Sequence, residues 1–177
     1  MKDVETEGFR LVRYADLSKA DAKYLDSYFA QEILPLLSVM IVGRKQPFPF
    51  LKNREIYALA ILERKGKKKL GIIPCESGML PRLVALPGVP GTYILLEELI
   101  LHYAPGLFKG YKVQEKTLMR ITRNADIDVS KVYDEDLNYR DQMEQVVKLR
   151  KKLAPVRIEF TRDISQKMVG EVCDYCE

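Results

Sequence analysis

The sequence Met119-Arg120-Ile121-Thr122-Arg123-Asn124-Ala125-Asp126-Ile127-Asp128-Val129 decides how the fold is interpreted. Its first half combines apolar and basic side chains in the manner of an extended segment. Arg123, Asn124 and Asp126 then supply polar side chains that bond back to the local backbone, which ends a strand. We therefore predict a strand over residues 112–122 that stops abruptly in a polar turn.

Several other segments carry the pattern of β-strands. Residues 56–62 are apolar on both faces, which is typical of a central strand covered on two sides. Residues 70–74 return after a basic turn at Gly66, so the two segments predict a β-hairpin. Shorter extended segments are predicted at residues 9–14, 81–86, 92–95 and 155–160.

Helical segments lie between these strands. Ser18 and Asp21 resemble a capping box that begins a helix over residues 19–34. A second helix is predicted over residues 95–103, where Pro105-Gly106 ends it. Further helices are predicted at residues 136–153 and 165–173. The order of elements predicts one domain over residues 1–177 with a mixed α/β (α+β) fold, in which a mixed β-sheet is flanked by helices.

The composition is that of an ordinary globular protein. The chain has 177 residues, of which 47% are hydrophobic and 31% charged, and its formal net charge is +4. No apolar run approaches the roughly 20 residues of a membrane helix, and the polar N-terminus lacks the apolar core of a secretory signal. We therefore expect a cytoplasmic protein without a membrane segment.

The cysteine and histidine content predicts little catalytic chemistry. Cys173 and Cys176 form a Cys-x-x-Cys motif at the C-terminus, but a redox or zinc site would need a strand–helix context or a second ligand pair. The single histidine, His102, has no phosphate-binding fingerprint beside it, so we expect a structural role. Asp126 and Asp128 suit Mg²⁺ bound with substrate phosphates, but such residues are commoner in turns and caps. We predict no catalytic residue and no metal ligand.

Four sets of segments resemble one known family in the right order. They are residues 8–12 with 24–37, residues 46–53, residues 80–84 with 95–100, and residues 119–128 with 156–159. The Pro-Phe-Pro-Phe and Arg-Ile-Thr-Arg-Asn-Ala-Asp motifs are the specific ones, and Gln46 stands where the family usually has histidine. Together they resemble the middle (head) domain of bacterial type 1 polyphosphate kinase over nearly the whole chain.

The resemblance implies a part of a larger enzyme. The full enzyme transfers the terminal phosphate of ATP to a growing polyphosphate chain, reversibly and with Mg²⁺. Its phosphorylated histidine and the arginines around it lie in two C-terminal domains, and an ATP-contacting domain precedes the head domain. We expect both flanks to be absent from this chain. The head domain resembles a three-layer α/β sandwich, similar to small phosphohistidine phosphatases, and helps to form the dimer and the walls of a basic tunnel. We therefore expect no kinase activity and no cofactor in this chain alone, with ATP and Mg²⁺ used by the parent enzyme.

Two pairs of residues are candidate sites. Arg120 and Arg123 flank the strand end, and guanidinium groups bind phosphate through paired hydrogen bonds, so we predict that they contact polyphosphate. The alternative for Arg123 is that it pairs with Asp126 or caps a turn. Phe48 and Phe50 would be costly to leave in water, so they belong either to the core or to an interface with other domains or a second subunit.

Two other functions stay open. The chain has basic runs at residues 64–69 and 148–152, which usually face water or complete a helix end. In a free-standing polyanion-binding module they would instead bind RNA or polyphosphate, although stacking aromatic residues are absent near those runs. A weaker hypothesis is a small phosphatase acting through His102. Whether the gene continues after Glu177 distinguishes the three hypotheses.

Overall fold

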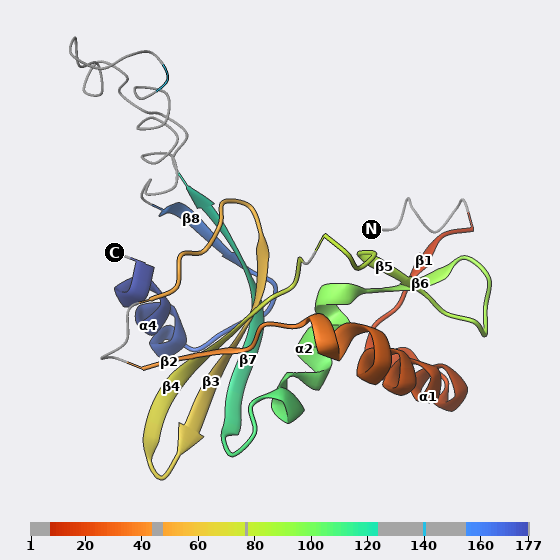
Figure 1. Ribbon diagram of the computed structural model, residues 1–177, viewed down its shortest axis with the longest axis horizontal. Helices are drawn as coiled ribbons and strands as arrows, with labels where there is room; N and C mark the ends of the chain where they lie inside the picture. Colours follow the sequence, from red (N-terminus) through yellow and green to blue (C-terminus); the bar gives the residue numbers. More distant parts are fainter. Residues whose placement is uncertain (1–7, 44–47, 77, 124–139, 141–154, 177) are drawn as a thin grey trace.

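The computed structural model describes the chain at residues 8–43, 48–76, 78–123, 140 and 155–176. Within these residues the strands form two sheets, with five and three strands (Figure 1). In chain order the elements are β1 (Arg10–Leu11), η2 (Tyr14–Asp16), α1 (Lys19–Tyr28), η3 (Phe29–Ile33), η4 (Leu34–Leu36), β2 (Met40–Val42), β3 (Ile56–Arg64), β4 (Lys67–Pro74), β5 (Leu83–Ala85), β6 (Thr92–Leu95), α2 (Leu96–Leu107), β7 (Lys112–Arg123), β8 (Pro155–Phe160) and α4 (Gln166–Cys176).

The larger sheet is the middle layer of three. Its strand order is β2-β4-β3-β7-β8, and each neighbouring pair is antiparallel. Alternate side chains of β3 enter two separate cores, because successive residues of a strand point to opposite faces. The core under α1 and α2 receives Ala58, Ala60 and Leu62. The core under α4 receives Tyr57, Leu59 and Ile61. The predicted mixed α/β class, the three layers and the doubly covered central strand are confirmed.

The remaining strands form a small sheet of their own, so the prediction of one mixed sheet is wrong in this detail. Its order is β1-β6-β5, with β1 parallel and β5 antiparallel to β6. The strands β5 and β6 have only three and four residues and are joined by a short turn, so they pair with each other. Figure 1 shows this sheet beside α1, away from the larger sheet.

The first helix begins and ends for local reasons. The Ser18 hydroxyl accepts a hydrogen bond from the backbone N–H of Asp21 (3.1 Å) and donates to the Asp21 carboxylate (2.6 Å), which confirms the predicted cap. The α-helical pattern stops at Tyr28, passes through a π-helical turn and ends in a 3-10 turn that contains Pro35. The predicted helix over residues 19–34 is thus present, and its final turns are π-helical and then 3-10.

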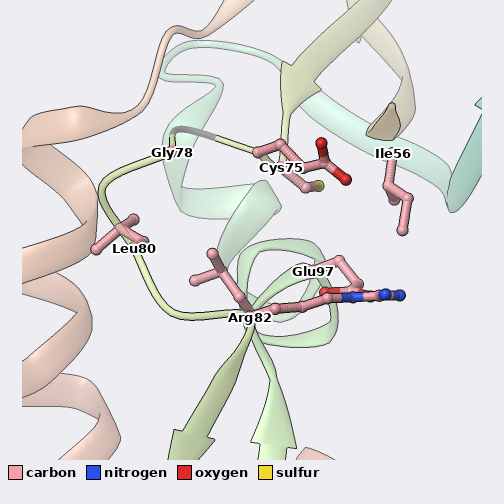
Figure 2. Close-up of a pocket in the computed structure, with 8 residues that line it drawn as sticks. Ile56, Cys75, Gly78, Leu80, Arg82 and Glu97 are labelled. Carbon is pink, nitrogen blue, oxygen red and sulfur yellow. The ribbon is translucent and has the colours of Figure 1, made fainter. Parts of the chain in front are cut away.

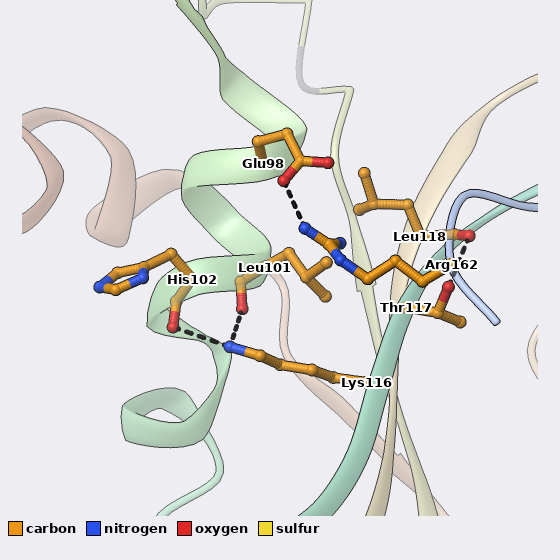
Figure 3. Close-up of polar contacts among 7 residues, drawn as sticks. All are labelled: Glu98, Leu101, His102, Lys116, Thr117, Leu118 and Arg162. Atoms are coloured by element: carbon orange, nitrogen blue, oxygen red, sulfur yellow. Dashed lines mark hydrogen bonds and ion pairs between the residues drawn. The ribbon is translucent and has the colours of Figure 1, made fainter. Parts of the chain in front are cut away.

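The second helix continues past the proline that was predicted to end it. Because Pro105 has no N–H, the carbonyl of Leu101 loses its usual helical partner. Lys116 of β7 replaces that partner: its ammonium group donates to the carbonyls of Leu101 (2.8 Å) and His102 (3.2 Å) (Figure 3). Burial and the neighbouring Arg162 lower the pKa of Lys116. The prediction that the helix ends at residue 103 is wrong, because the side chain of Lys116 supplies the hydrogen bond that Pro105 cannot donate.

The other boundaries agree with the sequence pattern to within a few residues. The hairpin of β3 and β4, the long strand β7 and its partner β8 lie where they were predicted. The first strand is shorter than the predicted residues 9–14, because the chain turns into η2. The predicted helix over residues 136–153 lies outside the described residues. Among the helices that the structure describes, none has the length and apolar character needed to span a bilayer.

Gly71 supplies a test of how closely the sheet packs under α2. A methyl group at Gly71 would lie 2.4 Å from the ring of buried Phe108, whereas one at Gly106 would meet no atom within 4 Å. We expect Gly71→Ala to lower the free energy of unfolding by about 1–3 kcal/mol through overpacking. Gly106→Ala, at an exposed position in the last turn of α2, should raise it by about 0.5–1 kcal/mol.

Urea denaturation of both variants measures these changes as shifts of the midpoint at constant slope. A Gly71→Ala protein as stable as the parent would contradict the close contact between β4 and Phe108.

Candidate functional site

A groove lies where the N-terminal end of α2 faces the ends of strands from the larger sheet. It consists of two cavities of about 240 and 370 Å³ that share Ile56, Arg82 and Glu97. The smaller cavity also reaches Cys75, and the larger one reaches Arg120. In Figure 2 the side chain of Arg82 runs alongside Glu97, with Cys75 and Ile56 across the smaller cavity.

An ion pair between Arg82 and Glu97 forms the shared wall. Nε and Nη2 of Arg82 both donate to Oε1 of Glu97, at 2.9 and 2.7 Å. The carboxylate side chain is only 6% exposed, whereas the arginine side chain is 64% exposed. A buried carboxylate needs such a partner, since an unpaired charge away from water is costly. The bond to Glu97 raises the pKa of Arg82, which therefore stays charged.

Backbone geometry fixes this pair in place. The carbonyl of Arg82 accepts a hydrogen bond from the N–H of Leu96 (2.8 Å), the first residue of α2. Glu97 lies in the first turn of that helix, where the helix dipole favours a negative charge. The segment before β5 is therefore joined to the start of α2 by both backbone and side chain.

The rim of the groove carries further arginine–glutamate pairs. Arg120 donates to Glu159 from Nε (3.1 Å), and its Nη2 lies 3.0 Å from the same carboxylate oxygen. The two residues are directly opposite each other in the β7–β8 register. Arg157 holds the second oxygen of Glu159 at 2.8 Å, and Arg162 binds Glu98 at 2.6 Å (Figure 3). The rim is thus a network of opposite charges in which each of these carboxylates has a guanidinium partner.

The groove has little capacity for nucleophilic chemistry. Burial raises the pKa of the Cys75 thiol to about 12, so at neutral pH it is protonated and unreactive. Among the described residues, no group of three or more His, Cys, Asp or Glu side chains could hold a metal ion. Cys173 is a free, exposed thiol. Asp126 and Asp128, which were considered for Mg²⁺, lie outside the described residues.

His102 lies apart from the groove, where α2 meets η2. Its ring stacks on Tyr14 at a centroid distance of 3.4 Å. Tyr14 in turn shares the carboxylate of Asp26 with Tyr103, and the two phenol groups are 3.1 Å apart. Partial burial and Lys116 lower the pKa of His102, which favours the neutral ring. This arrangement joins η2, α1 and α2, as a packing residue would.

Arg123 and the loop of residues 48–53 form a second surface feature at the end of β7. The Arg123 guanidinium lies 4.6 Å from the centroid of the Phe50 ring, and its Nε donates to the carbonyl of Leu51 (2.9 Å). The backbone N–H of Arg123 donates to the side chain of Asn53 (2.9 Å). Phe48 is half-buried against the core under α4, whereas Phe50 is 51% exposed. Arg123 therefore holds this loop on the sheet and presents one face of Phe50.

No sequence pattern predicted a role for Arg82 or Glu97. Only the charge of Glu97 on an otherwise apolar helix face could have drawn attention to it, because Leu101 and Ala104 on the same face are buried. The structure brings Arg120 to this groove and places Arg123 outside it, at the loop. The two predicted contact residues thus lie on one strand but in different surroundings.

The whole chain resembles part of a known enzyme. A family profile described as "Polyphosphate kinase middle domain" matches residues 20–177. The polyphosphate kinase of Bacillus anthracis is 34% identical over 168 residues, covering 90% of this chain and 24% of the relative. That of Lactiplantibacillus plantarum is 30% identical over 165 residues, covering 92% and 23%. The chain therefore spans about a quarter of the length of these curated relatives.

A solved structure supports the same fold. The crystal structure of polyphosphate kinase from Porphyromonas gingivalis superposes with a TM-score of 0.72. The match covers 99% of this chain and 24% of that chain, at 22% sequence identity.

The Arg82–Glu97 pair allows a matched test of buried against exposed ion pairing. Arg82 and Arg157 are similarly exposed (64% and 67%), but Glu97 is far more buried than Glu159. We expect Arg82→Ala to lower the free energy of unfolding by about 1–3 kcal/mol, since it leaves a buried carboxylate unpaired. Arg157→Ala should cost less than about 1 kcal/mol.

The measurement is urea denaturation at neutral pH. Adding Glu97→Gln to Arg82→Ala should recover part of the loss, because a neutral amide needs no counter-charge. If both arginine variants lost the same small amount, Arg82 would be an ordinary surface residue.

Proposed function

The chain belongs to the polyphosphate kinase family and matches its middle domain, and we propose that it acts as a non-catalytic assembly domain of such an enzyme. The observation that carries this proposal is the match to the middle domain over residues 20–177, at 24% of the length of the relative from Bacillus anthracis. In this role the domain binds the other domains of the same polyphosphate kinase and helps to build a homodimer or larger assembly. The transfer of phosphate from ATP to polyphosphate then belongs to the whole enzyme.

The donor groups of the groove support a non-catalytic role. A Mg²⁺–ATP site needs free carboxylate oxygens, but three of the four glutamates that line the groove, Glu97, Glu98 and Glu159, each bind an arginine. These three residues do not fit the metal or the nucleotide, and we assign ATP and Mg²⁺ to other domains of the enzyme. Polyphosphate synthesis from ATP by the purified chain would contradict this assignment.

The surface at Phe50 is the part that we propose for assembly. The half-exposed Phe50 ring is held by Arg123, which itself donates to the carbonyl of Leu51, so the ring loses little conformational freedom when a partner covers it. Phe48 packs the same loop against the core under α4. The occupant that we propose is another part of a polyphosphate kinase, because the chain matches only the middle domain of these enzymes.

We further propose that polyphosphate passes the end of β7 and contacts Arg120 and Arg123. The Arg120 side chain is 50% exposed and lies at the larger cavity of the groove, where it can exchange Glu159 for a phosphate oxygen. Arg123 combines its stacking on Phe50 with a charge at the strand end. The rival function, a free-standing polyanion-binding module, relied partly on residues 148–152, which lie outside the described residues.

Replacement of Phe50 tests the assembly role. In a full-length polyphosphate kinase that carries this domain, Phe50→Ala should lower the fraction of assembled enzyme, because the variant removes the exposed anchor. Light scattering after size-exclusion chromatography measures the mass of the assembly. Val89→Ala is the matched control, since Val89 is similarly exposed (54%, against 51% for Phe50) but lies on the β5–β6 loop. Unchanged assembly of a folded Phe50→Ala enzyme would refute the interface.

Replacement of Glu159 tests the polyphosphate contact at Arg120. Glu159→Gln removes the carboxylate that competes for Arg120 and Arg157, so the chain should bind polyphosphate more tightly. Arg120→Gln should weaken binding, and both effects should shrink at high salt. Calorimetric titration at two salt concentrations measures the affinities.

Glu32→Gln, at an exposed helical position, makes the same change in net charge and serves as the control. Equal affinities of the Glu159→Gln and Glu32→Gln proteins would show that only net charge matters and would remove Arg120 from the proposal.

A further inference from the structure

The tip of the β3–β4 hairpin gathers positive charge on one face. Lys65 and Gly66 both have positive φ (50° and 74°), so the strands are joined by a tight two-residue turn. Arg64 and Lys67 face each other across this turn. Because side chains alternate along a strand, Lys69 joins that pair on the same face, whereas Lys68 points to the opposite face with its partner Glu63.

The connection from α2 to β7 brings an aromatic residue to this face. Tyr111 lies directly before β7, beside the hairpin tip, and its N–H donates to the carbonyl of Phe108 (3.1 Å). Its ring centroid is 5.7 Å from Cζ of Arg64 and 5.8 Å from Nζ of Lys69, which is cation–π range. The sequence separates Tyr111 from the hairpin by more than 40 residues, so the basic run alone gave no sign of it.

These residues line an open pocket in which all the charged side chains are positive. It has a volume of about 250 Å³ and is lined by Arg64, Lys65, Lys67, Lys69 and Tyr111; these residues are called the hairpin pocket. None of the described carboxylates lines it, and Glu63 on the opposite face bonds to Gln114 (2.7 Å). A hydrogen bond from Lys69 lowers the pKa of the Tyr111 hydroxyl, as expected in a positive field. In the groove, by contrast, each arginine has a glutamate partner.

We propose that the hairpin pocket is a second binding site for inorganic polyphosphate, separate from the groove. Four cations around one small pocket favour a ligand with closely spaced negative charges. A single tyrosine, already engaged by two cations, is a poor platform for successive bases, so a phosphate chain without bases fits better than RNA. The identity of the anion rests on the proposed function, whereas the location of the site rests on the geometry of the hairpin.

The pocket is well separated from Arg120. In the sheet register Arg120 lies opposite Ile56, at the start of β3, and Arg64 lies at its other end. Eight residues of strand separate the two positions by about 26 Å. Substitutions at the two sites should therefore change polyphosphate affinity independently.

The test titrates polyphosphate into the purified chain at about 50 and 200 mM salt. The Lys67→Gln/Lys69→Gln protein should bind about tenfold more weakly at low salt, and its slope of log Kd against log salt should be smaller by about two. Lys68→Gln changes the neighbouring residue on the opposite face, and Lys19→Gln/Lys23→Gln removes two exposed charges from α1. Both controls should keep the affinity within about twofold of the parent. Circular dichroism checks that each variant is folded.

Each alternative outcome overturns the proposal in a distinct way. Equal losses in the hairpin and α1 double variants would show that only net charge matters. Equal affinity for a single-stranded RNA of matched charge, lost in the same variant, would make the pocket a general polyanion site. A failure here leaves the assembly role untouched, because that role is measured by the mass of the Phe50→Ala enzyme. Unchanged assembly of the Phe50→Ala enzyme, with the hairpin binding intact, would refute only the proposed assembly role.

Discussion

Burial of strand β3 on both faces is the constraint on which the rest of the structure depends. A strand that is apolar on both sides must be covered twice, and the chain supplies α1 and α2 for one face and α4 for the other. The close approach of the layers explains why Gly71 occupies the position under Phe108. The helix α2 continues past Pro105 because its last turn also covers the sheet. Lys116 of β7 provides the hydrogen bond that the proline removes, by donating to the carbonyl of Leu101. The helix and the strand beneath it therefore stabilise each other.

The same layering decides where polar groups gather. Apolar side chains fill the two faces of β3, and the charged residues of the groove and of the hairpin pocket gather near the ends of strands and in the first turn of α2. At one end the charges are balanced, since arginines and glutamates from α2, β7, β8 and the segment before β5 pair with one another. At the other end, the tip of the hairpin contributes cations and the connection before β7 contributes a tyrosine, and none of the described carboxylates lines this pocket. A balanced network holds segments together, whereas an unbalanced one attracts a counter-charge from outside.

Local patterns predicted those features that depend on neighbours in sequence. Three features depend only on residues close together in the sequence, and the structure confirms each of them. They are the apolar strand at residues 56–62, the turn at Gly66 and the helix cap at Ser18. Contacts between distant residues could not be predicted in this way. The helix past Pro105 depends on Lys116, and the carboxylate of Glu97 is stable because Arg82 reaches it from another segment. The separate small sheet likewise depends on which short strands pair with one another, and strand propensity does not specify that pairing.

The candidate site was the less predictable part for the same physical reason. Arg120 was identified from its motif. Its pairing with Glu159 depends on the register between β7 and β8, and a local sequence pattern does not predict that register. The run of residues 64–69 was predicted to face water, and strand alternation divides it into two faces with different surroundings. Only Tyr111, brought in by the connection after α2, converts one of those faces into a pocket. A charge run in a sequence is therefore ambiguous until its strand register is known, because the register decides which of the charges act together.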